Sequence, residues 1–350
     1  MTDLRVAVVG VGALGRHHAR ILSERENVNL VAVVDTNPDI AQNVAENCSC
    51  RSITDYREIL EDLDAVSIVV PTSAHLKVAR DFLERGIPVL VEKPLAINVA
   101  QSHELVNLAQ ENNTILQVGH IERFNPAMEI ARPLVSAPKY IRAERRSPYA
   151  FRSTDIGAVL DLMIHDIDLV LDLADDQLES VEAWGLCLFG GHEDKVQARL
   201  KFENGCIADL VADRIQPTAC RKLEILSLEG SLFVNLHSRE VINQVPTERL
   251  RQGPSPLELS QRPGADISKL KEDVFGGFID IQKPDVPAAD ALTAELNHFL
   301  QCVRTRTTPR VGGPEGLRAM QVAERILECV NSHQWDGNAA GPVGPHLKSA

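Results

Sequence analysis

The chain has 350 residues, of which 44% are hydrophobic and 24% are charged, with a formal net charge of −13. This length exceeds what one hydrophobic core usually fills, so we expect two domains, and the ordinary composition excludes a disordered protein. The acidic balance argues against a nucleic-acid surface, which needs clustered Lys and Arg.

Residues 4–118 alternate short apolar runs with helical patterns, which is typical of a parallel sheet covered by helices. Helices are predicted at 73–85 and 98–111, where apolar residues recur at helical spacing. Strands are predicted at residues 5–9, 30–34, 51–53, 65–70, 87–91 and 114–118.

The character of the sequence changes after residue 123. A helical pattern over 156–174 is followed by alternating segments with hairpin turns between them, which predict a largely antiparallel or mixed sheet. These strands are predicted at residues 181–189, 195–202, 206–213, 222–228 and 231–236, with a further one around 139–146.

The last third is less regular. Residues 246–287 are rich in Pro and Gly and predict a surface excursion, either a lid or an oligomer contact. Two helices are predicted at 291–304 and 315–331, followed by a flexible tail. We therefore predict an α/β fold with a parallel N-terminal domain (1–122), a C-terminal α+β domain (123–331) with an open sheet, and a tail (332–350). The uncovered face of the open sheet favours a homodimer or homotetramer.

Seven cysteines are spread along the chain without a C-x-x-C pair, so neither a disulfide framework nor a metal site is expected. The apolar start carries three glycines and no convincing cleavage site. No run approaches the roughly 18 apolar residues that span a bilayer. We expect a cytoplasmic protein that binds no metal, nucleic acid or membrane.

A glycine-rich turn with G-x-G-x-x-G spacing follows the first predicted strand and precedes a helix. It consists of Gly10, Val11, Gly12, Ala13, Leu14 and Gly15. In this context the glycines permit a tight turn, close approach of a pyrophosphate and close helix–strand packing. The turn predicts a Rossmann domain that binds a dinucleotide.

Asp35 ends the next predicted strand, twenty residues after Gly15. A carboxylate at this point accepts hydrogen bonds from the adenosine ribose hydroxyls. Thr36 follows it, and no arginine is adjacent to neutralise a 2′-phosphate. The pattern therefore predicts NAD, not NADP, as the cofactor.

Two groups of residues are candidates for the chemistry. Lys93 follows Glu92 directly after a predicted strand, at the edge of the sheet where ligands bind, and a lysine there can exchange a proton during hydride transfer. Asp161 and His165 are four residues apart, so a helix would place both on one face. A solvated acidic face and a core histidine are the alternatives for that pair.

The glycine turn, Asp35, Glu92-Lys93-Pro94 and the Asp161/His165 pair together resemble the Gfo/Idh/MocA oxidoreductase family, in order and in spacing. The resemblance implies that Lys93, Asp161 and His165 are catalytic. It also implies that a further set lies near the cofactor, namely Pro71, Thr72, His75 and Glu92.

Residues 118–127 and 151–160 further resemble a bacterial branch of that family, which oxidises C3 of UDP-N-acetylglucosamine for diamino-sugar lipid A together with a partner aminotransferase. A nucleotide-sugar substrate would need a local basic patch, for which we predict Arg146 and Arg152, with Arg123 and Asn125 nearer the sugar. His165 would also contact the substrate. A dehydrogenase of a free polyol and a non-catalytic sugar-sensing regulator are the alternatives, and the sequence leaves open whether Lys93 or His165 accepts the proton.

Overall fold

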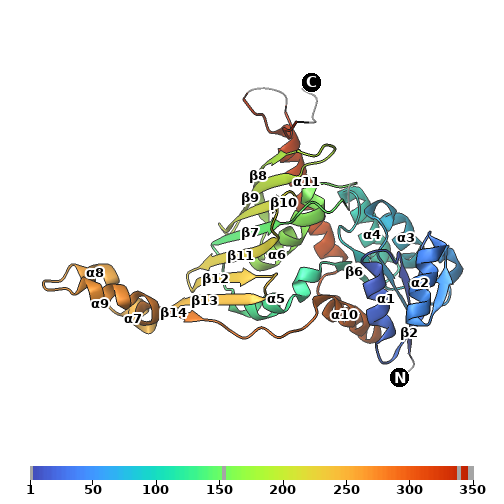
Figure 1. The fold of residues 1–350 in the computed structure, drawn as a ribbon, viewed down its shortest axis with the longest axis horizontal. Coiled ribbons are helices and arrows are strands. Elements are labelled where there is room, and N and C mark those ends of the chain that lie inside the picture. Colours follow the sequence, from blue (N-terminus) through green and yellow to red (C-terminus); the bar gives the residue numbers. More distant parts are fainter. Residues whose placement is uncertain (1–2, 152–154, 337–339, 346–350) are drawn as a thin grey trace.

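The computed structural model describes residues 3–151, 155–336 and 340–345. Two sheets dominate it, one in each half of the chain, and the Rossmann half lies beside the broad second sheet (Figure 1). An arm projects from the far edge of the second sheet, at the opposite end of the molecule from the Rossmann half. No helix within these ranges is long and apolar enough to cross a membrane.

The first sheet has six parallel strands in the order β3-β2-β1-β4-β5-β6. The inner strands are almost entirely buried because helices cover both faces, which explains their continuous apolar runs. The strands are β1 (Leu4–Val9), β2 (Val28–Val34), β3 (Arg51–Ile53), β4 (Ala65–Ile68), β5 (Val89–Glu92) and β6 (Leu116–Gly119).

Four helices connect these strands: α1 (Gly15–Ser23), α2 (Pro38–Cys48), α3 (His75–Leu83) and α4 (Val99–Glu111). Asn37 and Asn98 begin α2 and α4, because each side chain accepts a hydrogen bond from a backbone N–H of the first turn. The strand order reverses between β1 and β4, which creates a crevice at the carboxyl ends of the strands.

The second sheet has eight strands in the order β14-β13-β12-β11-β7-β10-β9-β8. The sheet is mixed, because β7 runs parallel to β10 while all other neighbouring strands pair antiparallel. The strands are β7 (Tyr140–Arg146), β8 (Leu178–Leu186), β9 (Lys195–Phe202), β10 (Ile207–Asp213), β11 (Cys220–Ser227), β12 (Gly230–Asn235), β13 (Glu240–Pro246) and β14 (Ile279–Gln282).

One face of this sheet packs against helices α5 (Pro126–Ala131), α6 (Ile164–Ala174) and α11 (Gly313–Ser332) (Figure 1). A π-helical turn, η5 (Val159–Met163), precedes α6, so the predicted helix over 156–174 begins with a wider winding. The predicted fold class is confirmed, and the strand predictions agree with the structure to within a few residues at their ends.

The region 246–287, predicted as a surface excursion, contains short strands and helices that the sequence analysis did not predict. Its ends belong to β13 and β14, which pair antiparallel with Pro246 opposite Ile279. Between them lie the short helices α7 (Glu248–Gln252), α8 (Pro256–Ser260) and α9 (Ile267–Glu272). The sequence analysis missed β13 because its residues alternate weakly and only Val241 is fully buried.

Helix α10 (Ala291–Thr305) packs on the Rossmann half, although residues 291–304 were predicted in the C-terminal domain. Its buried face joins the core cluster of β1 and α1 through Leu292, Leu296, Phe299 and Leu300. An apolar helix pattern does not say which sheet the helix covers. The predicted tail is also fixed where it is described, since the carbonyl of Val343 accepts a hydrogen bond from Cys187 N.

Candidate active site

The glycine turn is built for close approach of a ligand. A Cβ at Gly15 would lie 1.8 Å from the carbonyl oxygen of Gly10, and one at Gly10, where φ is +87°, would lie 2.6 Å from that of Val69. A Cβ at Gly12 would meet nothing within 4 Å. The first and third glycines therefore allow the turn itself, while the second leaves open space beside the backbone.

Helix α1 begins at this turn without a side-chain cap, because Leu14 occupies the capping position. The N–H groups of Arg16 and His17 donate to the carbonyl oxygens of Gly12 and Leu14, and the positive end of the helix dipole favours an anion at this turn. The turn, the open space at Gly12 and this helix end together fit the pyrophosphate of a dinucleotide.

Asp35 lies at the end of β2, beside the turn. Its carboxylate accepts hydrogen bonds from Val11 N at 3.1 Å and Asn37 N at 3.0 Å, which fix its position while the side chain stays half-exposed. Thr36 is exposed next to it. This carboxylate can accept hydrogen bonds from ribose hydroxyls and would repel a phosphate.

Lys93 joins the two halves of the chain. Its Nζ donates hydrogen bonds to the Asp161 carbonyl oxygen at 2.7 Å and to Asp161 Oδ1 at 3.3 Å. Burial lowers the pKa of Lys93, and the carboxylates of Asp161 and Glu92 oppose that shift. Asp161 therefore holds the Lys93 ammonium in place, while burial disfavours its charged form and the two carboxylates favour it.

His165 follows in the first turn of α6. Its ring stands edge-on to that of His120, with centroids 6.4 Å apart, and its buried Nδ1 has no hydrogen-bond partner among the described residues. Burial and the neighbouring cations Lys93 and Arg145 hold the pKa of His165 well below its usual value. The imidazole is consequently neutral at neutral pH.

The structure joins Asp161 to Lys93, and none of the hydrogen bonds among the described residues links Asp161 to His165. The prediction that both lie on one face of an α-helix assumed regular winding. Asp161 instead belongs to the π-helical turn that ends before His165. The wider turn directs Asp161 across the domain boundary.

Glu92 lies behind Lys93 in a buried polar group. Its Oε1 is 3.2 Å from His18 Nε2, and the other His18 ring nitrogen lies 2.9 Å from Ser67 Oγ. Glu295 of α10 is fully buried nearby and its carboxylate has no hydrogen-bond partner in the described chain. Burial, together with the charges of Glu92 and Asp168, raises the pKa of Glu295 well above its usual value.

The loop after β4 holds the other predicted cofactor residues. Thr72 is buried, Pro71 is exposed, and the His75 ring nitrogens lie 2.9 Å from the carbonyl oxygens of Val70 and Pro94. His75 thereby ties this loop to the segment after Lys93. It supports the site from inside the protein.

The predicted substrate residues are distributed differently. Arg123 pairs with Asp168 at 2.7 Å and also with Asp172, so its charge is compensated within the chain. Asn125 caps α5 by accepting a hydrogen bond from Ala127 N at 3.0 Å. Arg152 lies outside the described residues.

Arg145 is the arginine that sequence analysis passed over. Its side chain is 3% exposed and pairs with Asp166 and Glu122, each at 2.8 Å, whereas that of Arg146 is 40% exposed and pairs with Glu144. The two arginines differ because side chains alternate along a strand, and Arg145 shares the buried face of β7 with Ile141 and Ala143. The alternation of apolar residues along this segment could have identified Arg145 as the inward-facing arginine.

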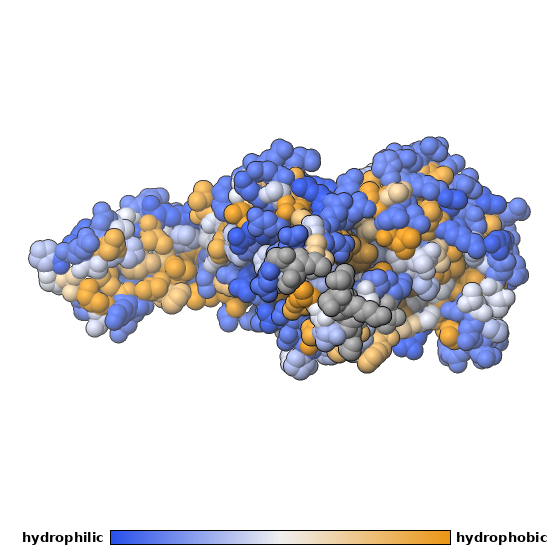
Figure 2. All heavy atoms as spheres, turned by 90° about the horizontal axis from the view of Figure 1, so that it is seen from above, coloured by the Kyte–Doolittle hydropathy of each residue, from blue (hydrophilic) through white to orange (hydrophobic). Residues whose placement is uncertain are grey.

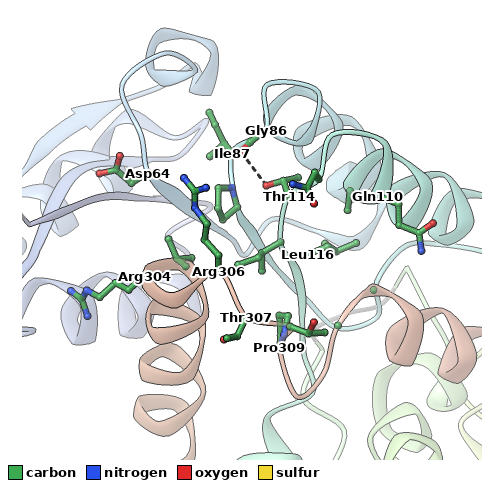
Figure 3. Close-up of a pocket in the computed structure, with 18 of the residues that line it drawn as sticks. Asp64, Gly86, Ile87, Gln110, Thr114, Leu116, Arg304, Arg306, Thr307 and Pro309 are labelled. Carbon is green, nitrogen blue, oxygen red and sulfur yellow. Dashed lines mark hydrogen bonds between the residues drawn. The ribbon is translucent and has the colours of Figure 1, made fainter.

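A separate cavity of about 1200 Å³ opens at the opposite, amino end of the Rossmann strands. Figure 3 shows Arg306 in the middle of the cavity lining, below Gly86 and Ile87 in this view, while Arg304 and Asp64 lie to one side. None of the predicted catalytic residues lines this cavity, and Arg304 already donates to the Asn27 carbonyl oxygen. Cavity size therefore does not locate the chemistry here.

The glycine turn, the Asp35 carboxylate and the lysine between the domains define a two-domain dinucleotide-dependent oxidoreductase. A family model described as an oxidoreductase family with an NAD-binding Rossmann fold, Gfo/Idh/MocA, matches residues 4–120. The model of the Gfo/Idh/MocA C-terminal domain matches residues 131–233. The chain belongs to the Gfo/Idh/MocA oxidoreductase family.

Among its relatives, UDP-N-acetylglucosamine 3-dehydrogenase of Acidithiobacillus ferrooxidans is 31% identical over 333 residues, covering 95% of this chain and 99% of that protein. A solved structure of that enzyme superposes with a TM-score of 0.82 at 31% identity and covers 94% of this chain and 98% of that one. The scyllo-inositol 2-dehydrogenase (NAD(+)) of Bacillus subtilis is 29% identical over 329 residues, covering 88% of this chain and 89% of that protein. The chain is an NAD-dependent dehydrogenase that acts on the CH–OH groups of sugars or polyols.

Proposed function

We propose that this dehydrogenase oxidises the C3 hydroxyl of UDP-N-acetylglucosamine to the 3-keto nucleotide sugar. The observation that carries the proposal is the similarity to the Acidithiobacillus enzyme, which extends over 99% of that protein. The product carries a ketone, which is the group that an aminotransferase consumes. We therefore propose an aminotransferase as the next enzyme.

We infer the cofactor site from the geometry described above. The turn from Gly10 to Gly15 and the start of α1 would hold the pyrophosphate, and Asp35 would hold the adenosine ribose with Thr36 beside it. Pro71, Thr72, His75 and Glu92 would complete the wall of the site. NAD, when bound, supplies the hydride acceptor.

We assign the proton acceptor to His165. Its imidazole is neutral at neutral pH and can accept the hydroxyl proton, while the hydroxyl carbon loses its hydride. Lys93 already donates two hydrogen bonds to Asp161, which leaves its remaining N–H to stabilise the developing alkoxide. Asp161 is then the residue that orients Lys93.

The substrate's nucleotide end needs cations beside its pyrophosphate. Arg146, which is half-exposed, and Arg152 remain our candidates, with Arg123 and Asn125 near the sugar. Remote binding of the nucleotide supplies energy that positions the sugar hydroxyl. Free N-acetylglucosamine should accordingly be a very poor substrate.

A free polyol is the second candidate substrate, because the Bacillus scyllo-inositol 2-dehydrogenase is almost as similar over a comparable length. The deciding experiment measures NADH formation by absorbance with NAD and a panel of UDP-sugars, free sugars and inositols. Turnover of UDP-N-acetylglucosamine, with the oxidised carbon identified by trapping the ketone, supports the proposal. Turnover of inositols without any UDP-sugar would overturn it.

A further inference from the structure

Three aromatic side chains gather at one end of the second sheet, where two connecting segments meet. Tyr149 and Phe151 belong to the segment between β7 and η5, and Phe189 belongs to the segment between β8 and β9. The Tyr149 ring stands edge-on to both phenylalanines, with its centroid 4.8 Å from that of Phe151 and 4.7 Å from that of Phe189. We call these three residues the aromatic cluster.

The aromatic cluster is open to solvent. Phe151 and Phe189 are 85% and 57% exposed, and Tyr149 is half-buried between them. Seen from above in Figure 2, the surface is largely hydrophilic and apolar residues form patches within it. Phe151 also has a left-handed backbone, with φ at +50°, which is rare for a bulky residue and is found mostly at functional sites. Exposed rings that contact one another are typical of a surface that binds a ligand.

Buried polar contacts hold the aromatic cluster in place. Arg214 lies over the Tyr149 ring, with Cζ 5.3 Å from the ring centroid, and its Nε donates to Asp194 Oδ1 at 2.8 Å. Asp194 is fully buried, and its other carboxylate oxygen accepts a hydrogen bond from Phe189 N at 2.8 Å. The two segments are therefore fixed relative to each other, and a ligand would find the rings already arranged.

The same contacts join the aromatic cluster to the turn that carries Asp161. Arg214 donates to the carbonyl oxygen of Ile156 at 2.8 Å. The buried carboxylate of Glu193 accepts a hydrogen bond from Val159 N at 3.0 Å. Val159 begins η5, two residues before Asp161. The aromatic cluster therefore lies on the segments that build the active site.

Neighbouring charge indicates what the aromatic cluster binds. Arg146, at the end of β7, is half-exposed and is our candidate for the pyrophosphate of a nucleotide sugar, and Tyr149 follows it three residues later. In such a substrate the base is joined through its ribose to that pyrophosphate. A planar base stacks on aromatic rings, whereas a free polyol has neither a base nor a pyrophosphate. The adenine of NAD is not the candidate, because Asp35 places the dinucleotide on the Rossmann half.

We propose that the aromatic cluster is the subsite for the base of the nucleotide sugar, which is uracil in the substrate proposed above. The exposed rings of Phe151 and Phe189 contact the base, while Tyr149, backed by Arg214, supports both rings. The inference rests on the proposed nucleotide-sugar substrate and adds the residues that hold its base. Stacking tolerates any base, so the aromatic cluster contributes affinity more than discrimination between bases.

The first test measures the binding of UDP, which carries the base and the pyrophosphate but no hexose. Calorimetric titrations are made with NAD at saturation, so that UDP cannot occupy the dinucleotide site. The test variant combines Phe151→Ala with Phe189→Ala. The matched control is Phe275→Ala, because Phe275 is 59% exposed and lies just before β14, at the opposite edge of the sheet from β8 (Figure 1). Unchanged NAD affinity checks that each variant is folded.

UDP should bind the intact chain and the Phe275→Ala control equally well. The double variant should raise the Kd for UDP roughly 10-fold or more, because the base loses its stacking partners. Phe151→Trp, which keeps an aromatic face, should retain the affinity of the intact chain. An intact chain that binds no UDP would mean that another kind of partner covers the rings, and it would overturn the subsite. A double variant that binds UDP as well as the intact chain would overturn it too.

The second test locates the contact on the ligand by saturation-transfer difference NMR. Irradiation of the protein should transfer more magnetisation to H5 and H6 of uracil than to the ribose protons, and this preference should disappear in the double variant. Stronger transfer to the ribose than to the base in the intact chain would contradict the stacking.

Steady-state kinetics separate this inference from the proposed function. With UDP-N-acetylglucosamine, the double variant should raise KM roughly 10-fold or more and leave the KM for NAD unchanged. A chain that binds UDP through the aromatic cluster but oxidises no UDP-sugar contradicts the proposed function and supports the subsite. A chain that oxidises UDP-N-acetylglucosamine with the same KM in the double variant supports the function and contradicts the subsite.

Discussion

Lys93 is a side chain to which both halves of the chain contribute. Its Nζ reaches across the domain boundary to the carbonyl and carboxylate of Asp161, so the C-terminal half orients a lysine that the Rossmann half supplies. His165 approaches the same place from α6 without a partner on Nδ1 in the described chain. Proton acceptor and proton donor are therefore separate residues in the mechanism we propose.

Lys93→Met and His165→Ala should each lower kcat by roughly 100-fold or more, because each removes a positioned acid–base or hydrogen-bonding group. NAD affinity should be nearly unchanged, since the glycine turn and Asp35 are untouched. Steady-state kinetics with the true substrate and titration with NAD check this. Near-normal kcat in either variant would reassign that residue to a structural role.

The pH dependence tests the assignment of His165. Its folded pKa is depressed, so the imidazole stays neutral, and able to accept a proton, down to a pH well below 6.5. The acidic limb of kcat/KM should lie below 6.5, and activity should fall as pH drops through it. The lowered pKa also reduces the free energy of unfolding at acid pH, because His165 takes up a proton in the unfolded chain before it does so in the folded one. An acidic limb at or above the usual histidine value would argue against His165 as the acceptor.

We propose that the choice between NAD and NADP rests on the Asp35 carboxylate. Asp35→Ser combined with Thr36→Arg should shift kcat/KM toward NADP, because it removes the charge that repels a 2′-phosphate and adds one that attracts it. The unmodified enzyme should strongly prefer NAD. Equal use of both cofactors by the unmodified enzyme would contradict the role given to Asp35.

At the level of elements, strand β7 places two adjacent arginines in different environments, with Arg145 buried and Arg146 partly exposed. Arg145→Met should lower the free energy of unfolding by about 3–5 kcal/mol, because it leaves the buried carboxylates of Asp166 and Glu122 unpaired. Arg146→Met, the control on the same strand, should change it by no more than about 1 kcal/mol. Urea unfolding of both variants makes the comparison, and similar losses would contradict the inward orientation of Arg145.

Two glycines of the turn between β1 and α1 have different roles, one in folding and the other in NAD binding. Gly15→Ala should disrupt the fold, since its Cβ would clash with the Gly10 carbonyl oxygen at 1.8 Å. Gly12→Ala has open space and should fold normally, yet weaken NAD binding by filling the approach of the pyrophosphate. Thermal unfolding and NAD titration distinguish the two effects. A folded Gly12→Ala variant that binds NAD with unchanged affinity would contradict the proposal that the pyrophosphate approaches the backbone at Gly12.

On the scale of the whole molecule, the Rossmann half depends on a helix from the end of the chain. Leu296 and Phe299 of α10 are buried against β1 and α1, nearly 300 residues from the strand they cover. A fragment of residues 1–122 exposes that apolar face and should not unfold cooperatively, whereas the full chain should. Circular dichroism and thermal scans test this, and a stable, cooperative fragment would show that α10 is dispensable.

The sequence by itself determined the features that local chemistry encodes. The glycine spacing and Asp35 predicted the Rossmann turn and NAD, because each depends on a few neighbouring residues and a strand–helix context. Alternation with hairpin turns predicted most of the second sheet. These signals are short-range, so they survive without knowledge of the fold.

Only the tertiary structure decided what depends on distant contacts. It paired Asp161 with Lys93 instead of His165, turned Arg145 inward and Arg146 outward, and assigned α10 to the Rossmann half. Apolar periodicity states that a face is buried but not against which partner, and a π-helical turn changes where a side chain points without a distinct sequence signal. Long-range packing therefore fixed the active-site partners, while local patterns fixed the cofactor.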